Sequence, residues 1–73
     1  MIDEKVFVYH PPQGNQAERY EILRSSAKGF AEQIDLHCPD SVEKSVAINK
    51  LREAMMWANS SIAIREDSNA LFQ

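Results

Sequence analysis

One short interruption divides this chain into two long stretches with helical periodicity. His37-Cys38-Pro39 ends the first stretch, because proline lacks a backbone donor and disfavours helix in the residue before it. Asp40 and Glu43 then have the spacing of a capping box, which starts a second helix. Helices joined by two to five residues lie antiparallel. The sequence therefore predicts an all-α fold, an antiparallel two-helix hairpin of helices 16–37 and 41–66.

The residues before the first helix, 1–15, predict a short extended arm. Residues 5–9 are rich in β-prone side chains, and the two prolines that follow force an extended path. Asn15 and Glu18 again have capping-box spacing, so we expect the first helix to start at Gln16. This stretch is therefore predicted to be an arm and not a helix.

The two predicted helices together carry more apolar surface than one hairpin can cover. In the first helix the apolar stripe recurs every three or four residues, at Tyr20, Leu23, Ala27, Phe30, Ala31 and Ile34. In the second helix the apolar row is Ile48, Leu51, Met55, Ala58 and Ile62, widened by Ala47, Ala54 and Met56. Because a monomer rarely exposes so large a patch, the pattern predicts a second contact surface, on another subunit.

The small size of the chain also favours self-assembly. A chain of 73 residues forms one domain, here 1–73, and buries only about 60% of the surface that its unfolded form exposes. The single cysteine, Cys38, allows no disulfide within the chain, so oligomerisation is the favoured means of stabilisation. We expect Cys38 to be a small buried apolar group. The polar tail, which begins at Glu66 and includes 67–73, is expected to fray.

Composition argues against several classes of function. No apolar stretch is long enough for a membrane span, and the N-terminus lacks the pattern of a signal peptide, so we expect no membrane partner. A formal net charge of −3 argues against binding long nucleic acid. Besides His37 and Cys38, only His10 could serve as a soft metal ligand, too few for a zinc site. With neither a phosphate loop nor a catalytic triad, we expect no enzyme, metal or cofactor.

Several short motifs, in their order and spacing, resemble the helical-hairpin domain shared by the anti-CBASS and anti-Thoeris phage sponges. The resemblance covers roughly residues 6–65, almost the whole chain. The motifs are Tyr9-His10-Pro11-Pro12, Tyr20-Glu21-Ile22-Leu23-Arg24, Cys38-Pro39-Asp40-Ser41, Met56-Trp57-Ala58-Asn59 and Ile62-Ala63. Anti-Thoeris members carry an additional β-rich N-terminal region before the hairpin. Because this sequence shows no such region, we expect the shorter anti-CBASS type.

The resemblance implies a homohexamer of hairpins that sequesters bacterial immune signals in the cytoplasm of the infected bacterial host. The ligands it implies are cyclic dinucleotides, cyclic trinucleotides or cyclic ADP-ribose isomers, bound without chemical change. By this account the immune effector is blocked because its signal is removed.

The resemblance also implies ligand-binding residues. In the shorter sponges a tyrosine ahead of the first helix stacks on a base, and a basic residue fifteen positions later meets a phosphate. This spacing falls on Tyr9 and Arg24, with Arg in place of the more frequent Lys. Otherwise, Tyr9 could simply pack on the hairpin, and Arg24 could be a solvated charge paired with Glu21. Lys28 is a further candidate ligand-binding residue.

Three more candidates carry open alternatives. Ser26 could offer a hydroxyl to a phosphate or could be an ordinary surface serine. Arg65 matches the place where the family gathers arginines for cyclic trinucleotides. Alternatively, it could pair with Glu66 or Asp67, or it could be an ordinary C-terminal cation that the helix dipole stabilises. Asn59 is suited either to a subunit interface or to a ligand contact. By contrast, Met56 and Trp57 are expected in the core of the oligomer.

Two other classes of function remain as alternatives. The chain could be an oligomeric helical-hairpin interaction protein that binds a host polypeptide through its surplus apolar face. A nucleic-acid-binding hairpin is the third alternative, and the acidic charge disfavours it.

Overall fold

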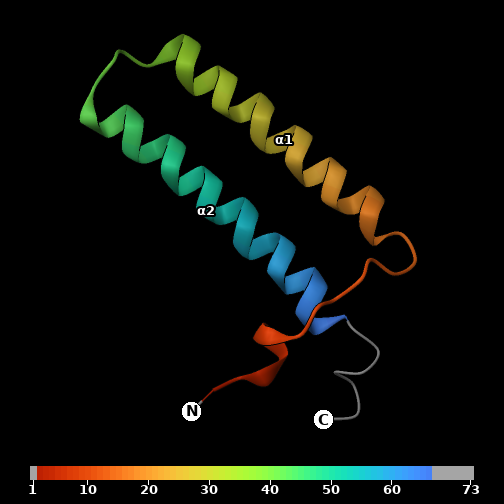
Figure 1. Cartoon of the computed structure of the whole chain (residues 1–73). Coiled ribbons are helices and arrows are strands. Elements are labelled where there is room, and N and C mark those ends of the chain that lie inside the picture. The colour runs from red at the N-terminus through yellow and green to blue at the C-terminus, as the bar shows by residue number, and fades with distance from the viewer. Residues whose placement is uncertain (1, 67–73) are drawn as a thin grey trace.

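The computed structural model describes residues 2–66 and consists of helices. A single 3₁₀ turn, η1 (Glu4–Phe7), precedes α1 (Gln16–His37) and α2 (Val42–Arg65), and the described residues contain no strand. The two long helices run antiparallel and are joined by residues 38–41 (Figure 1). The predicted all-helical hairpin is thus confirmed.

The beginning of the arm is not extended as predicted. The backbone of Glu4–Phe7 forms a 3₁₀ turn because Asp3 satisfies two nearby donors. The Asp3 carboxylate accepts from the backbone N–H of Lys5 at 3.1 Å, and the Asp3 carbonyl accepts from that of Val6 at 3.1 Å. Local bonds of this kind compete with strand formation, and β-propensity has little effect without a neighbouring strand. At Val8, directly after this turn, the backbone is extended.

The start of α1 lies at Gln16, but the predicted capping box does not form. Asn15 makes no side-chain cap, because its backbone (φ −92°, ψ 15°) lies outside the extended region that a capping residue requires. Gly14 turns the chain there with φ 54°. The Gln16 side chain accepts from the backbone N–H of Gln13 at 3.0 Å, which closes the turn ahead of the helix.

The start of α2 differs from the prediction by one residue. Ser41, not Asp40, is the capping residue: its backbone is extended and its hydroxyl accepts from the backbone N–H of Lys44 at 3.0 Å. The Asp40 carboxylate instead binds the Lys44 ammonium at 3.0 Å, and Asp35 of α1 binds it at the same distance. Lys44 has only 10% of its side chain exposed, and it ties the connection to both helices.

Polar contacts also join the other end of the hairpin. Gln16, the only buried residue among 2–66, donates to Glu66 at 3.3 Å and to the carbonyl of Ile62 at 3.5 Å. Arg19 forms a two-point ion pair with the same carboxylate. The expectation that fraying begins at Glu66 is therefore wrong for this residue, whereas 67–73 lie outside the described residues.

The hairpin has no buried apolar core of its own. None of the described apolar side chains is fully buried, and large ones such as Phe30 and Trp57 (75% exposed) face solvent. Cys38 is exposed as well, which corrects the expectation that it is buried, because the connection projects beyond both helices. No helix within residues 2–66 has the length and hydropathy of a membrane span. The surplus of apolar surface expected from the sequence is thus present in the folded chain.

Candidate functional site

The seam between α1 and α2 carries a groove on each side. Ala27, Leu51 and Met55 line both grooves and form the seam itself. Along α1, Ser26 and Phe30 project to one side of Ala27 whereas Arg24 and Lys28 project to the other, as a period of 3.6 residues requires. The two faces of the hairpin therefore differ in chemistry, one apolar and one cationic.

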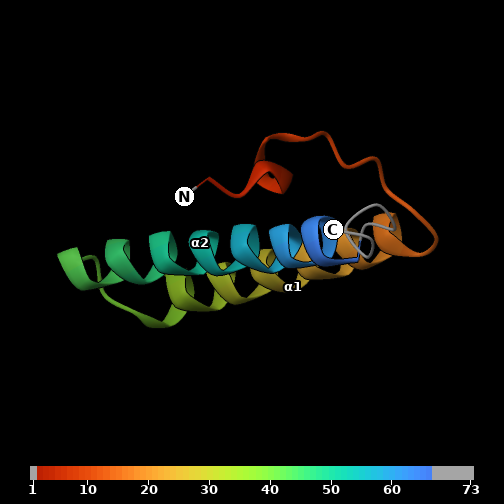
Figure 2. The same ribbon diagram turned by 90° about the horizontal axis from the view of Figure 1, so that it is seen from below.

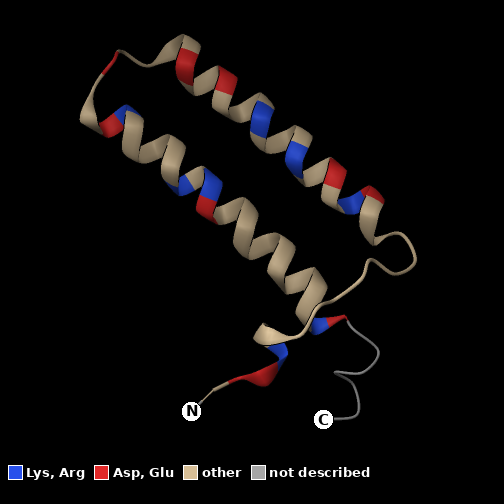
Figure 3. Ribbon diagram, in the orientation of Figure 1, with Lys and Arg blue, Asp and Glu red and all other residues tan. Residues whose placement is uncertain are grey.

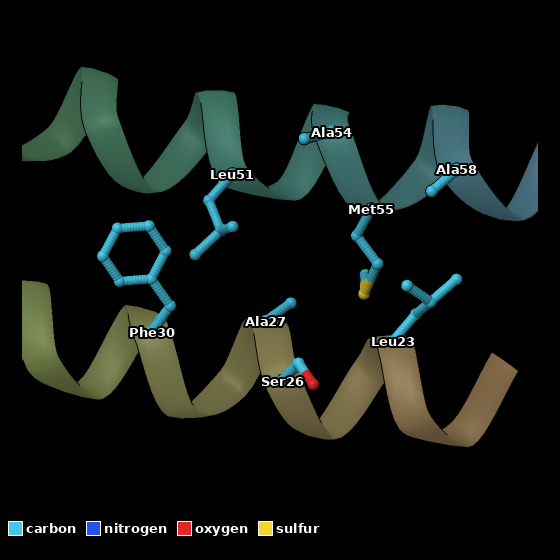
Figure 4. A pocket seen from close by; sticks show the side chains of 8 residues that line it. All are labelled: Leu23, Ser26, Ala27, Phe30, Leu51, Ala54, Met55 and Ala58. Atoms are coloured by element: carbon cyan, nitrogen blue, oxygen red, sulfur yellow. The ribbon is translucent and has the colours of Figure 1, made fainter. Parts of the chain in front are cut away.

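The apolar side, which we call the Phe30 groove, encloses about 310 Å³. Figure 4 shows side chains from both helices converging on it. Its lining residues are Leu23, Ser26, Ala27, Phe30, Leu51, Ala54, Met55 and Ala58. Apart from the hydroxyl of Ser26, every side chain in this groove is apolar, which suits contact with another apolar surface.

The opposite side, which we call the Arg24 groove, encloses about 180 Å³. It is lined by Arg24, Ala27, Lys28, Ala31, Ile48, Leu51, Arg52 and Met55. Three of these side chains are cationic, and none is a carboxylate. This groove can attract an anion, although the chain as a whole is acidic.

A third concavity, the polar hollow, adjoins the Arg24 groove at the end nearer the arm. It measures about 350 Å³ and is lined by His10, Tyr20, Arg24, Asn59, Ser60 and Ala63. Because Arg24 lines both concavities, they lie on the same face of the hairpin. The arm contributes His10, whose Nε2 lies 2.6 Å from the carbonyl oxygen of Lys5. Aromatic, amide, hydroxyl and guanidinium groups thus meet in one place.

Arg24 pairs with Glu21 one helical turn away, with 3.3 Å between Nη1 and Oε2. This is the alternative role that the sequence offered. Both side chains are mostly exposed, and exposed ion pairs contribute at most about 1 kcal/mol. A phosphate, which accepts charge-assisted hydrogen bonds from a guanidinium in a bidentate geometry, can compete with so weak a pair.

Asn59 carries an unsatisfied acceptor at the polar hollow. Its Oδ1 is buried and has no hydrogen-bond partner among residues 2–66. A buried acceptor left without a donor costs about 1–3 kcal/mol. A donor from a ligand or from a second subunit would satisfy this oxygen, and these are the two roles considered for Asn59.

The structure brings some of the predicted site residues together and leaves others apart. Arg24, Lys28 and Asn59 lie on one face. Ser26 lines the groove on the opposite face. Tyr9 is 81% exposed and lines none of the three concavities described here, where His10 is the arm residue.

Arg52 lines the Arg24 groove, and sequence reasoning did not single it out. The one sequence feature that could have indicated a groove position for Arg52 was its place next to Leu51 of the apolar row. The sequence alone could not show which flank of that row faces the Arg24 side of α1.

Arg65 pairs with the arm rather than with its sequence neighbour Glu66. Its Nη2 lies 3.2 Å from Oδ2 of Asp3. The pKa of Asp3 is lowered, mainly by the hydrogen bond from the backbone N–H of Lys5 and also by Arg65. Asp67, the other partner considered, lies outside the described residues. Within residues 2–66 no group of three or more His, Cys, Asp or Glu side chains could hold a metal ion.

Comparison with known protein families gives one match. The family model described as the Acb2/Tad1 hairpin domain matches residues 2–63. No significant match was found among curated proteins or among solved structures.

Proposed function

Because the chain belongs to the Acb2/Tad1 hairpin family of anti-CBASS and anti-Thoeris sponges, we propose that it binds cyclic oligonucleotide immune signals and sequesters them unchanged. The preferred class is cyclic dinucleotides, and cyclic trinucleotides and cyclic ADP-ribose isomers are further candidates. The protein would act in the cytoplasm of the infected bacterial host, where these signals are made. No catalytic step belongs to this proposal.

The observation that carries the proposal is the junction of the Arg24 groove with the polar hollow. A cyclic dinucleotide presents phosphates and bases side by side, so its receptor needs cations next to flat and hydrogen-bonding surfaces. Arg24 stands between these two kinds of surface. At about 350 Å³ the hollow is at the lower end of the 300–1,000 Å³ usual for small-molecule sites. In this proposal one hairpin supplies part of the site.

Completion of the site by a second copy of the chain fits the exposed apolar surface. Figure 3 shows that charged residues are spread along α1, whereas α2 is uncharged from 54 to 64. Apart from Asn59, Ser60 and Ser61, the side chains of this segment are apolar, and so wide an apolar surface is normally buried. We therefore propose a homo-oligomer, with Met56 and Trp57 in its interfaces, and a hexamer by analogy with the family.

Tyr9 fits this arrangement because it is exposed on the arm and free to stack on a base held by a neighbouring copy. Figure 2 shows the arm standing on one side of the layer formed by the two helices. The proposed role of Tyr9 is therefore intermolecular.

Isothermal titration tests the proposal against a panel of cyclic di- and trinucleotides and cyclic ADP-ribose isomers. We expect dissociation constants near nanomolar for at least one ligand, about −12 kcal/mol, since a sponge must outcompete an immune receptor. Light scattering of the same sample should give several times the mass of one chain. A monomer without affinity for the panel would refute the proposal.

One observation favours a second candidate function, the binding of a host polypeptide. The exposed Met56 and Trp57 on α2 could hold an amphipathic partner helix instead of a second copy. A monomeric mass would favour this alternative, because self-assembly would otherwise occupy the same surface.

A further inference from the structure

Lys28 of α1 and Arg52 of α2 line the Arg24 groove from its two sides, and neither forms an ion pair or a hydrogen bond with another residue of 2–66. Most of the other cations among residues 2–66 form ion pairs, and Lys5, which forms none there, does not line this groove. A carboxylate pairs with each of four of these other cations, Arg19, Lys44, Lys50 and Arg65. Two cations are thus left without counter-charge in a groove that contains no carboxylate.

The groove also has an apolar floor. Ala27, Leu51 and Met55 form the seam beneath the three cations. An anion seated there would be partly shielded from water, and charge-assisted hydrogen bonds are stronger where water is excluded. Arg24 and Lys28 are one turn apart on α1, about 6 Å along the helix axis. Cations at this spacing can each contact a different phosphate of one small ligand.

From this arrangement we propose that Lys28 and Arg52 form a second phosphate site beside Arg24. The inference rests on the proposed function and adds to it. One phosphate of a cyclic dinucleotide binds Arg24 at the edge of the polar hollow, and the other binds between Lys28 and Arg52. Arg52 supplies a planar fork that suits bidentate contact, and Lys28 supplies a mobile point charge. Both helices of one hairpin then hold the same ligand.

The test is titration of a cyclic dinucleotide, cyclic di-AMP, cyclic di-GMP or cyclic GMP-AMP, into the full-length wild type and four single variants, Arg52→Gln, Arg52→Lys, Lys28→Gln and Lys50→Gln. Arg52→Gln and Lys28→Gln remove the proposed contacts. Lys50→Gln is the matched control, since Lys50 lies on the same helix as Arg52, pairs with Glu53 at 3.6 Å and lines none of the three concavities. All five proteins are compared at the same ionic strength, and light scattering gives their masses.

We expect Arg52→Gln and Lys28→Gln to weaken binding about tenfold or more, the usual effect of losing a hydrogen bond to a charged group. Lys50→Gln should change the affinity by less than about twofold. Arg52→Lys should recover part of the loss, because the charge returns without the fork. The mass should remain that of the wild type in every variant.

Two results would overturn this inference while leaving the proposed function intact. One is wild-type affinity in both Arg52→Gln and Lys28→Gln. The other is a lower mass in these variants, which would show that the two cations contact a second copy of the chain instead. A wild type that binds no member of the panel would instead overturn the proposed function, and this inference with it.

Discussion

Asp3 of the arm and Arg65 at the end of α2 form an ion pair, with 3.2 Å between the carboxylate and the guanidinium. These residues are far apart in the sequence, and the pair places the arm beside the end of the helix. The contact also occupies the one arginine that the family resemblance associates with cyclic trinucleotides. The position of the arm and the availability of Arg65 are therefore coupled.

The first prediction concerns Arg65. Arg65→Ala should weaken binding of a cyclic trinucleotide by about tenfold or more, since a contact to a charged phosphate is lost, and should leave cyclic dinucleotide binding unchanged. Asp3→Asn should strengthen cyclic trinucleotide binding, because Arg65 no longer has a competing carboxylate. Calorimetry with both ligands measures each effect. Equal losses for both ligands in Arg65→Ala would indicate a folding defect or a shared site.

The second prediction concerns Tyr9. Tyr9→Ala should weaken cyclic dinucleotide binding by about 1–3 kcal/mol, the effect of removing an aromatic stacking surface. Phe7→Ala is the matched control, because Phe7 is an equally exposed aromatic residue of the same arm. Titration should show a loss for Tyr9→Ala alone, and light scattering should show the wild-type mass for both. An unchanged affinity in Tyr9→Ala would exclude the stacking role.

The third prediction concerns Gly29, which lies in the interior of α1. A Cβ placed on Gly29 meets no atom within 4 Å in the hairpin, so space does not require glycine there. Gly29→Ala should therefore raise the free energy of unfolding by about 0.5–1 kcal/mol, through the lower backbone entropy of the unfolded chain. Urea unfolding measures this. Destabilisation instead would show that a second copy packs closely against Gly29.

The fourth prediction concerns pH and Glu66. Arg19 and then Gln16 lower the pKa of the Glu66 carboxyl through hydrogen bonds. A group whose pKa is lower in the folded state stabilises the fold above its ordinary pKa, here 4.5, and loses that effect as the pH falls through its folded value. Glu66→Gln should therefore be less stable than wild type at neutral pH and nearly equal at pH ~2.

The matched control for this prediction is Glu32→Gln. Glu32 is an exposed carboxylate of α1 that has no ion pair within residues 2–66. Its replacement should have little effect on urea midpoints at either pH. If Glu66→Gln matched the wild type at neutral pH, the contacts of Glu66 with Arg19 and Gln16 would make no net contribution to stability.

The hairpin was predictable because helical periodicity and the break at Pro39 are local signals. The exact starts of the two helices were less predictable, since a cap depends on backbone angles as well as on residue type. Asn15 and Ser41 are both suitable capping residues by composition, yet only Ser41 has the extended backbone that lets its side chain reach the helix. The turn at Glu4–Phe7 was missed because Asp3 bonds its own neighbours more effectively than an unpaired strand could.

The candidate site was predictable in part. Arg24, Lys28 and Asn59 were named from the sequence, and they lie on one face. Arg52 was missed because α2 is apolar over so much of its circumference that its sequence does not show which side faces the cations of α1. The Asp3–Arg65 pair was missed because only the folded hairpin brings these residues together.

Recovery of the ligand tests the central claim most directly. The purified protein is mixed with a cyclic dinucleotide in less than stoichiometric amount, free ligand is separated by ultrafiltration, and the protein is then denatured and filtered again. Sequestration predicts almost no free ligand at first, and full recovery of the intact cyclic dinucleotide after denaturation. Ligand that remains free at the start, or that returns as a linear product, would contradict the account.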